Sequence, residues 1–374
     1  MSKRAILIAF AVAAAAASTA SAQLLGGPLG GVTQPVTDTL GQVGNTVDNV
    51  LGDPTRSGIA DLSGDRGRSQ GVVPVSLDRV VQPIGVVTAT AGQLAQLRKA
   101  RLALLIKTHR KELDGDQHGQ PVRRGELVVT DPDPQSLSAA LRTGFRVTGD
   151  ERIGELGLRL VTLAIPRGLN TREALTRLRA AAPALQADYN HVYEPAGGAL
   201  MPAAAATLAA SPAVRGGTRI AMIDGGLASH PSLARAGIEQ RGFAGPAQPT
   251  GHGTAVGSLL VGDQGPFRGA ARGAQLFVGD VYGGNAAAGS ATAIVRALGW
   301  VASKKPAVIN ISLVGPSSRT LARAIAALRG RGIAVIAAVG NDGPAAPPQF
   351  PASYPGVVAV TGVDSGDRAL REAG

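Results

Sequence analysis

The sequence predicts an α/β protein: a C-terminal parallel sheet with helices on both faces, preceded by a smaller α+β unit. Two observations predict this fold class. From about residue 214 onward, short apolar runs alternate with helical segments, and residues 125–195 follow the order β-α-β-β-α-β. Continuous apolar strands separated by helices are typical of parallel sheets that are covered on both faces.

The part from 214 to 374 has four apolar segments that we interpret as strands. Helical segments separate them. In such sheets, ligands and catalytic groups gather at the carboxyl ends of the strands. The expected strands are RIAMI, AQLFVGDVY, AVINISL and IAVIAAV, and the expected helices are TAVGSLLVG, SATAIVRALGWVASK and RTLARAIAALRGR.

Residues 125–195 are predicted to form a compact ferredoxin-like unit. Asp133 followed by Pro134 marks the start of its first helix, because Asp is a favoured N-cap and Pro is favoured at the first helical position. Asn170 with Glu173 forms a capping box ahead of the second helix. This fold hosts many functions, so the role of the unit has to be inferred from the neighbouring C-terminal part of the chain.

Residues 93–124 are interpreted as a basic amphipathic helix followed by a linker. Cations surround four leucines at helical spacing. Such a helix packs on a protein core or lies on a membrane surface, and both alternatives are open from the sequence. The leucines are Leu94, Leu97, Leu102 and Leu105.

The N-terminus, residues 1–22, has the three regions of a secretory signal peptide. Lys3 and Arg4 precede a short apolar run, which ends in Ala20-Ser21-Ala22. An uncleaved membrane anchor is the alternative. No later apolar segment approaches about 18 residues, so we expect a secreted or periplasmic protein with no membrane span after signal removal.

Two segments of low complexity separate the predicted units. Residues 23–92 are rich in Gly, Pro, Val and Thr without a persistent period, which is typical of a flexible spacer or a surface-attachment segment. Residues 196–213 are a linker of small residues, the kind of exposed stretch that proteases cut.

Composition excludes several function classes. The chain has no cysteine, so disulfides, thiolate metal sites and cysteine nucleophiles are all excluded. Its net charge of +11 is scattered, and aromatic residues make up only 3%, which argues against nucleic-acid binding. No cofactor is evident, because the histidines show no metal-ligand spacing; those considered are His109, His118 and His191.

Two residues at expected strand and helix ends are candidates for catalysis. Asp224 ends the strand RIAMI, and His252 lies between glycines just before a helical run. Each alone is also typical of a turn or a structural position. Asn341, in Gly-Asn-Asp-Gly, is likewise compatible with an ordinary turn.

Together, four segments resemble the motifs of the subtilisin-like serine proteases (subtilases, peptidase family S8) in the order of that family. IAMIDGGLASHPSL resembles the Asp motif and GHGTAVGSLL the His motif. AVINISLVG resembles the substrate-binding strand, and IAVIAAVGNDGP the segment that supplies an oxyanion-hole Asn. The resemblance implies a subtilisin-like fold over 214–374, with the unit at 125–195 as its prodomain.

The resemblance also implies the roles of the residues. His252 takes the proton of a serine hydroxyl, Asp224 orients the imidazole, and Asn341 donates to the oxyanion. A peptide substrate adds as a strand to the cleft segment. Calcium is implied by the family alone, since no acidic cluster marks a metal site. The substrate-binding residues are Ser312, Leu313, Val314 and Gly315.

The nucleophilic serine has no counterpart in this sequence. The family's Gly-Thr-Ser motif occurs nowhere in it, and the serines after Asn341, Ser353 and Ser365, come too early and in the wrong context. The expectation is a truncated product whose serine lies beyond residue 374. The predicted function is a secreted serine endopeptidase made as a zymogen, with peptide substrates and its own prodomain as partners. The alternative is a non-catalytic pseudoprotease or inhibitor-like module.

Overall fold

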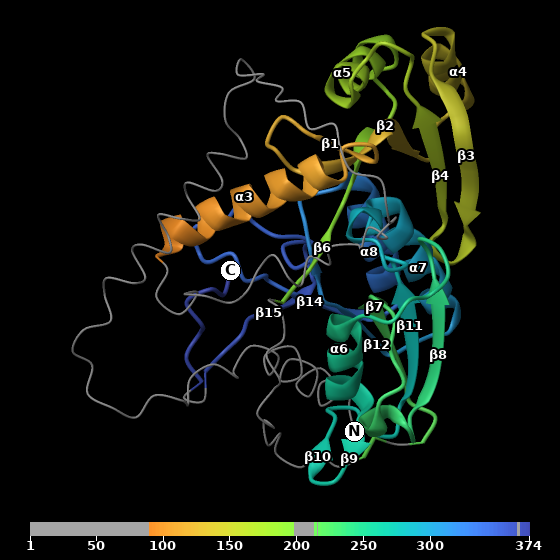
Figure 1. Cartoon of the computed structure of the whole chain (residues 1–374). Helices are drawn as coiled ribbons and strands as arrows, with labels where there is room; N and C mark the ends of the chain where they lie inside the picture. Colours follow the sequence, from red (N-terminus) through yellow and green to blue (C-terminus); the bar gives the residue numbers. More distant parts are fainter. Residues whose placement is uncertain (1–89, 198–212, 215, 365–366) are drawn as a thin grey trace, which may run out of the picture.

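The structure, a computed structural model, describes residues 90–197, 213–214, 216–364 and 367–374. The predicted signal peptide, nearly all of the 23–92 spacer and most of the 196–213 linker lie outside these residues. Among the helices of the described part, none is long and apolar enough to cross a membrane. Figure 1 shows the two units that the sequence predicts, the larger one built around a central sheet.

The central sheet has six strands, and every strand pair within it is parallel. The apolar strands form its centre, as predicted. The edge strand β8 was not anticipated, because its sequence GIEQRG has no apolar run; an edge strand needs only one paired neighbour and one buried face. In spatial order the strands are β15 (Val358–Val360), β14 (Ala334–Ala338), β12 (Val308–Ile311), β7 (Arg219–Asp224), β11 (Gln275–Asp280) and β8 (Gly237–Gly242).

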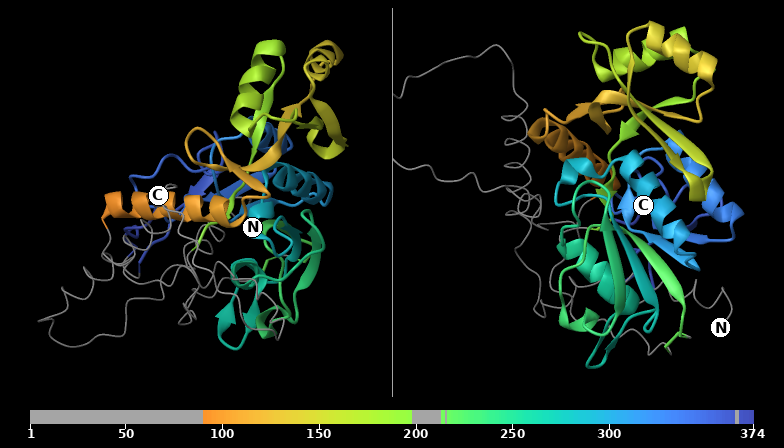
Figure 2. Two further views of the ribbon diagram at one scale, coloured as in Figure 1. Left: turned by 45° about the horizontal axis from the view of Figure 1, so that its top comes forward. Right: turned by 90° about the vertical axis from the view of Figure 1, so that its right-hand side faces the viewer.

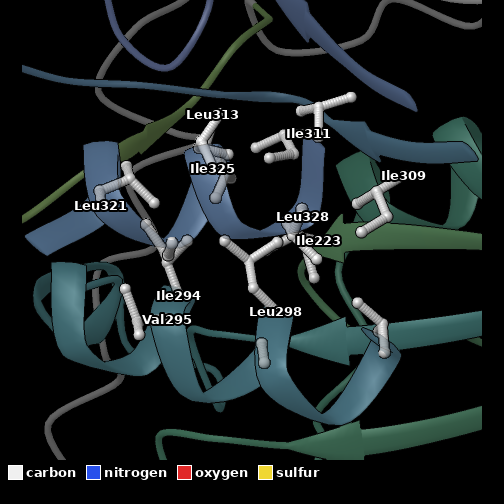
Figure 3. Close-up of a cluster of buried hydrophobic side chains, with 14 of the residues drawn as sticks. Ile223, Ile294, Val295, Leu298, Ile309, Ile311, Leu313, Leu321, Ile325 and Leu328 are labelled. Carbon is white, nitrogen blue, oxygen red and sulfur yellow. The ribbon is translucent and has the colours of Figure 1, made fainter. Parts of the chain in front are cut away.

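Helices cover both faces of this sheet, as the alternating pattern predicts. Ala221 and Ile223 of β7 face the core beneath α7 (Ala291–Ser303) and α8 (Arg319–Gly330). Ile220 and Met222, the alternate residues, belong to a second core together with residues of α6 (Gly251–Val261). Figure 3 shows side chains of α7 and α8 interlocking above the strands in the first of these cores.

Replacing Leu298 with alanine is expected to lower the free energy of unfolding by about 2–5 kcal/mol. Leu298 lies in α7 with a fully buried side chain, so its loss removes apolar contacts and leaves a cavity. Leu141→Ala is the matched control, because Leu141 is 40% exposed on another helix. Urea denaturation measures both, and equal effects of the two substitutions would contradict the assigned core.

The preceding unit is a five-stranded antiparallel sheet with two helices. Its strand order β5-β2-β4-β3 is that of the predicted ferredoxin-like fold. Asp133 and Asn170 cap the two helices, as expected. The elements are β1 (Leu113–Gly115), β2 (Pro121–Thr130), α4 (Pro134–Arg142), β3 (Arg146–Ile153), β4 (Leu158–Ala164), α5 (Thr171–Ala181) and β5 (Ala187–His191).

The sheet of this unit packs on α7 and α8 (Figure 2). Asp188 of β5 accepts a hydrogen bond from the backbone N–H of Arg319, in the first turn of α8, at 2.9 Å. Asn190 accepts from the backbone N–H of Thr292 in α7 at 3.1 Å. The first N–H groups of a helix lack partners within the helix, so these two side chains satisfy donors that would otherwise face solvent or bulk protein.

The prediction for residues 93–124 was partly wrong. Helix α3 runs from Ala91 to Thr108, and residues 109–124 are not a linker, because they contain β1 and the start of β2. Leu97 is 39% exposed, whereas the other three leucines are buried. The buried stripe instead includes Arg98, one turn after Leu94, and this arginine has partners that the helix sequence does not reveal.

Candidate active site

Asp224 and His252 meet at the carboxyl edge of the central sheet. Asp224 ends β7 and is fully buried, and His252 lies in the first turn of α6 with a side chain that is 14% exposed. His252 Nδ1 lies 2.8 Å from Asp224 Oδ1. In this geometry the carboxylate accepts the Nδ1 proton and leaves Nε2 as the basic nitrogen.

Glycines allow the turn after β7 and the start of α6 to approach each other. Thr250 caps α6, its hydroxyl oxygen accepting from the N–H of Gly253 at 2.9 Å. A Cβ at Gly225 would lie 2.3 Å from the Thr250 hydroxyl oxygen. A Cβ at Gly253 would lie 2.5 Å from the carbonyl oxygen of Gly225. Side chains at either glycine would therefore push His252 away from Asp224.

Asp224 also accepts from the N–H of Gly225 at 2.7 Å, again through Oδ1. Its other oxygen, Oδ2, is buried and has no hydrogen-bond partner among the described residues. The backbone bond and the imidazole thus converge on one oxygen. This convergence holds Oδ1 in place opposite the imidazole.

Asp280 is a positioning residue that the sequence did not single out. It ends β11 in register with Asp224 and is fully buried. Its carboxylate accepts from the backbone N–H groups of Gln248, Tyr282 and Gly283 at 2.7 to 3.0 Å. The bond from Gln248 holds the loop that leads into α6, and the other two hold the turn after β11. The available sequence signal was a carboxylate inside the apolar segment AQLFVGDVY.

The predicted substrate-binding residues Ser312–Gly315 lie beside a segment of this same chain. Leu313 and Val314 form β13, which pairs antiparallel with β6 (Glu194–Pro195). Figure 1 labels β6. The N–H of Ala196 donates to the carbonyl oxygen of Ser312 at 2.8 Å. An extended segment therefore adds to the edge here, as peptides do in β-augmentation.

This segment continues to His252. The carbonyl oxygen of Ala196 lies 3.3 Å from His252 Nε2. A Cβ placed on Gly197 would lie 3.0 Å from the same nitrogen. The peptide bond between Ala196 and Gly197 is thus adjacent to the basic nitrogen, a contact between residues that are 56 positions apart in sequence.

Tyr193, just before β6, anchors the segment. Its side chain is fully buried, and its hydroxyl donates to the carbonyl oxygen of Pro316 at 2.7 Å. A Cβ at Gly315 would lie 2.5 Å from the Tyr193 ring, so the glycine makes room for the ring. Burial raises the pKa of Tyr193 well above its usual value, which keeps the hydroxyl protonated as a donor.

Asn341 lies in the loop directly after β14, at the same carboxyl edge of the sheet as Asp224. Gly340 and Gly343, on either side, have φ of +94° and +78°, a left-handed conformation that favours glycine. Glycine at both positions therefore allows the loop to adopt this shape.

Two serines and a histidine of the preceding unit are among the residues that the sequence excluded from catalysis and metal binding. Ser353 is exposed in a turn, and its hydroxyl donates to the carbonyl oxygen of Gln349 at 2.7 Å. Ser365 lies outside the described residues. His191 contacts Asp116 at 3.2 Å inside the preceding unit. Within the described parts of the chain, no group of three or more His, Asp or Glu side chains could hold a metal ion.

Comparison with known proteins relates the C-terminal part of the chain to a protein family. Residues 215–371 match the Subtilase family, Peptidase_S8. The chain is 34% identical over 158 residues to Subtilisin Savinase of Lederbergia lenta, covering 40% of this chain and 56% of that protein. It is equally identical over the same length to the alkaline protease of Alkalihalobacillus alcalophilus, of which it covers 40%. The chain thus spans about half or less of the length of these relatives.

One solved structure supports the fold. The crystal structure of fervidolysin from Fervidobacterium pennivorans, a keratinolytic enzyme related to subtilisin, matches with a TM-score of 0.55 at 17% identity. The match covers 68% of this chain, more than residues 215–371 account for, and 46% of that chain. Residues 215–371 thus match the Subtilase family and are similar in sequence to the subtilisin-like serine proteases.

Proposed function

We propose that this chain is the precursor of a secreted serine endopeptidase in which His252 is the general base and Asp224 its orienting carboxylate. The observation that carries the proposal is the 2.8 Å contact between Nδ1 and Oδ1 at the carboxyl edge of the sheet. A serine hydroxyl is a weak nucleophile at neutral pH and needs such a base. The proposal requires a serine in a Gly-Thr-Ser motif, which these 374 residues do not contain.

The catalytic cycle assigns one task to each group. His252 Nε2 takes the serine proton and later returns it to the leaving amine, while Asp224 stabilises the imidazolium. Asn341 donates its amide N–H to the oxyanion of the tetrahedral intermediate. Residues Ser312–Gly315 hold an extended peptide through their backbone, which explains why a small side chain suffices at several of these positions.

The unit before the catalytic domain is proposed to act as its inhibitory prodomain. Its C-terminal residues already pair with β13 and reach His252, so a peptide substrate cannot bind there at the same time. The hydrogen bonds that Asp188 and Asn190 accept from the starts of α8 and α7 support the docked position. Export by the signal peptide, with cleavage after Ala22, completes the proposal.

Processing of the Ala196–Gly197 bond tests the proposed function. The assay uses the extended chain, defined as these 374 residues followed by a Gly-Thr-Ser segment from the downstream coding sequence or from a curated relative. We expect casein hydrolysis, and a mature N-terminus at Gly197, because the carbonyl of Ala196 lies next to His252 Nε2. N-terminal sequencing of the purified product reads out the cut.

The control is the extended chain with His252→Ala, which should remain uncut. A correctly folded extended chain that neither cuts itself nor hydrolyses casein would favour the alternative, a pseudoprotease. Cutting at a different bond would leave the catalytic assignment standing and would contradict the assigned position of the segment 194–197.

A further inference from the structure

Helix α3 contacts the loop that carries Asn341 through a buried ion pair. Arg98 Nε lies 3.1 Å from Oδ2 of Asp342, the residue after Asn341, although this contact does not have hydrogen-bond geometry. Both side chains are nearly inaccessible, at 7% and 5% exposure. Arg98 also donates to Gln120 at 2.9 Å, which ties the same guanidinium to the β1–β2 hairpin.

Arg101, one turn further along α3, joins that loop to the segment in the cleft. Its guanidinium donates to both carboxylate oxygens of Glu194 in β6, at 3.1 and 3.2 Å. It also donates to Asp342 Oδ1 at 3.0 Å. Burial acts to lower the pKa of Arg101, but the carboxylates of Glu194 and Asp342 together raise it above its usual value. The arginine therefore stays charged between two acids.

Apolar contacts support α3 at both ends of this ion network. Leu94 lies so close to Gly343 that a Cβ on the glycine would approach its Cδ1 to 2.8 Å. Leu105 is buried with Leu113 and Val192. Val192 comes shortly before the segment 194–197. Figure 1 shows α3 lying alongside β6 and the C-terminal part of the chain.

The burial of these charges makes their contacts interdependent. Removing one partner of a buried ion pair leaves the other charge without compensation, which is strongly unfavourable. If α3 left its place, Asp342 would lose both arginines at once. The shape of the Asn341 loop and the docking of β6 are therefore coupled through one helix.

We propose that α3 is part of the inhibitory unit, and that Arg98, Arg101, Asp342 and Glu194 form a charged clasp that holds both β6 and the Asn341 loop. The interaction surface of the inhibitory unit then begins at α3 and not at residue 125. This role in inhibition rests on the proposed function. The clasp itself is a structural claim that holds or fails without any catalytic assay.

Hydrogen–deuterium exchange on the full 374-residue chain tests the clasp. Two amides report on it directly: Ala196 N–H donates to Ser312, and Gly343 N–H donates to the carbonyl of Glu372 at 2.9 Å. In Arg101→Gln we expect exchange to be at least about tenfold faster at both sites, because losing this arginine releases the two segments it joins. Lys99→Gln is the matched control, since it removes the same charge from an exposed position on α3.

A second variant guards against general unfolding. Asp342→Asn removes the shared acid and should speed exchange at Ala196 as well, although Asp342 does not contact Ala196. Exchange within β7 should stay as in the unaltered chain for all variants. Faster exchange confined to residues 91–108, or equal effects of Arg101→Gln and Lys99→Gln, would overturn the proposal. Loss of activity in the extended chain would not change these exchange rates. Failure of the proposed function and failure of the clasp can therefore be distinguished.

Discussion

Replacing His252 with alanine in the extended chain is expected to lower kcat for peptide hydrolysis by about 10⁶-fold, the effect of removing the histidine in subtilisin itself. The imidazole is the group within reach of the Ala196 carbonyl, and Asp224 already fixes its tautomer. Without it, no base activates the serine, and only substrate binding and oxyanion stabilisation remain. Steady-state hydrolysis of a chromogenic peptide measures the loss.

Asp224→Asn serves as the graded comparison. An asparagine keeps the shape of the side chain but favours the wrong imidazole tautomer, with an expected loss in kcat of about 10⁴-fold. The loss should be smaller than that of His252→Ala. Equal activity of the Asp224→Asn and unaltered enzymes would contradict the role given to the 2.8 Å contact.

Asn341→Ala is expected to lower kcat by about 10²–10³-fold with little change in KM, as loss of the corresponding donor does in subtilisin. The amide donates to an oxyanion that exists only after attack, so ground-state binding does not depend on it. Asn285→Ala is the control, because Asn285 donates to Glu112 of the preceding unit, which the proposed processing would remove. A large rise in KM at unchanged kcat would assign Asn341 to substrate binding instead.

Features that depend on neighbouring residues were predictable from the sequence. The caps at Asp133 and Asn170 are set within three residues of each helix start, and the structure confirms both. The apolar central strands follow equally directly, since burial on both faces requires a continuous apolar run. The edge strand β8 was missed because it has a polar face and only one neighbouring strand. Its sequence therefore contains no continuous apolar run.

Features that depend on distant partners were not predictable. The helical pattern of leucines among cations did not single out Arg98, which is buried because Asp342 lies far away in sequence but next to it in space. The Ala196–His252 contact likewise joins residues from two units. For the candidate site, motif order indicated Asp224, His252 and Asn341, while Asp280 and the occupying segment became apparent only from the fold.

Asp224 and His252 are proposed to activate a serine hydroxyl that the Gly-Thr-Ser segment of the extended chain supplies. Labelling with a fluorophosphonate probe tests it most directly, because the probe reacts with a serine only when a base has activated it. We expect no labelling of the 374-residue chain, and labelling of the extended chain at the serine of Gly-Thr-Ser that His252→Ala abolishes. Robust labelling of the 374-residue chain, at Ser353 or Ser365, would contradict the claim.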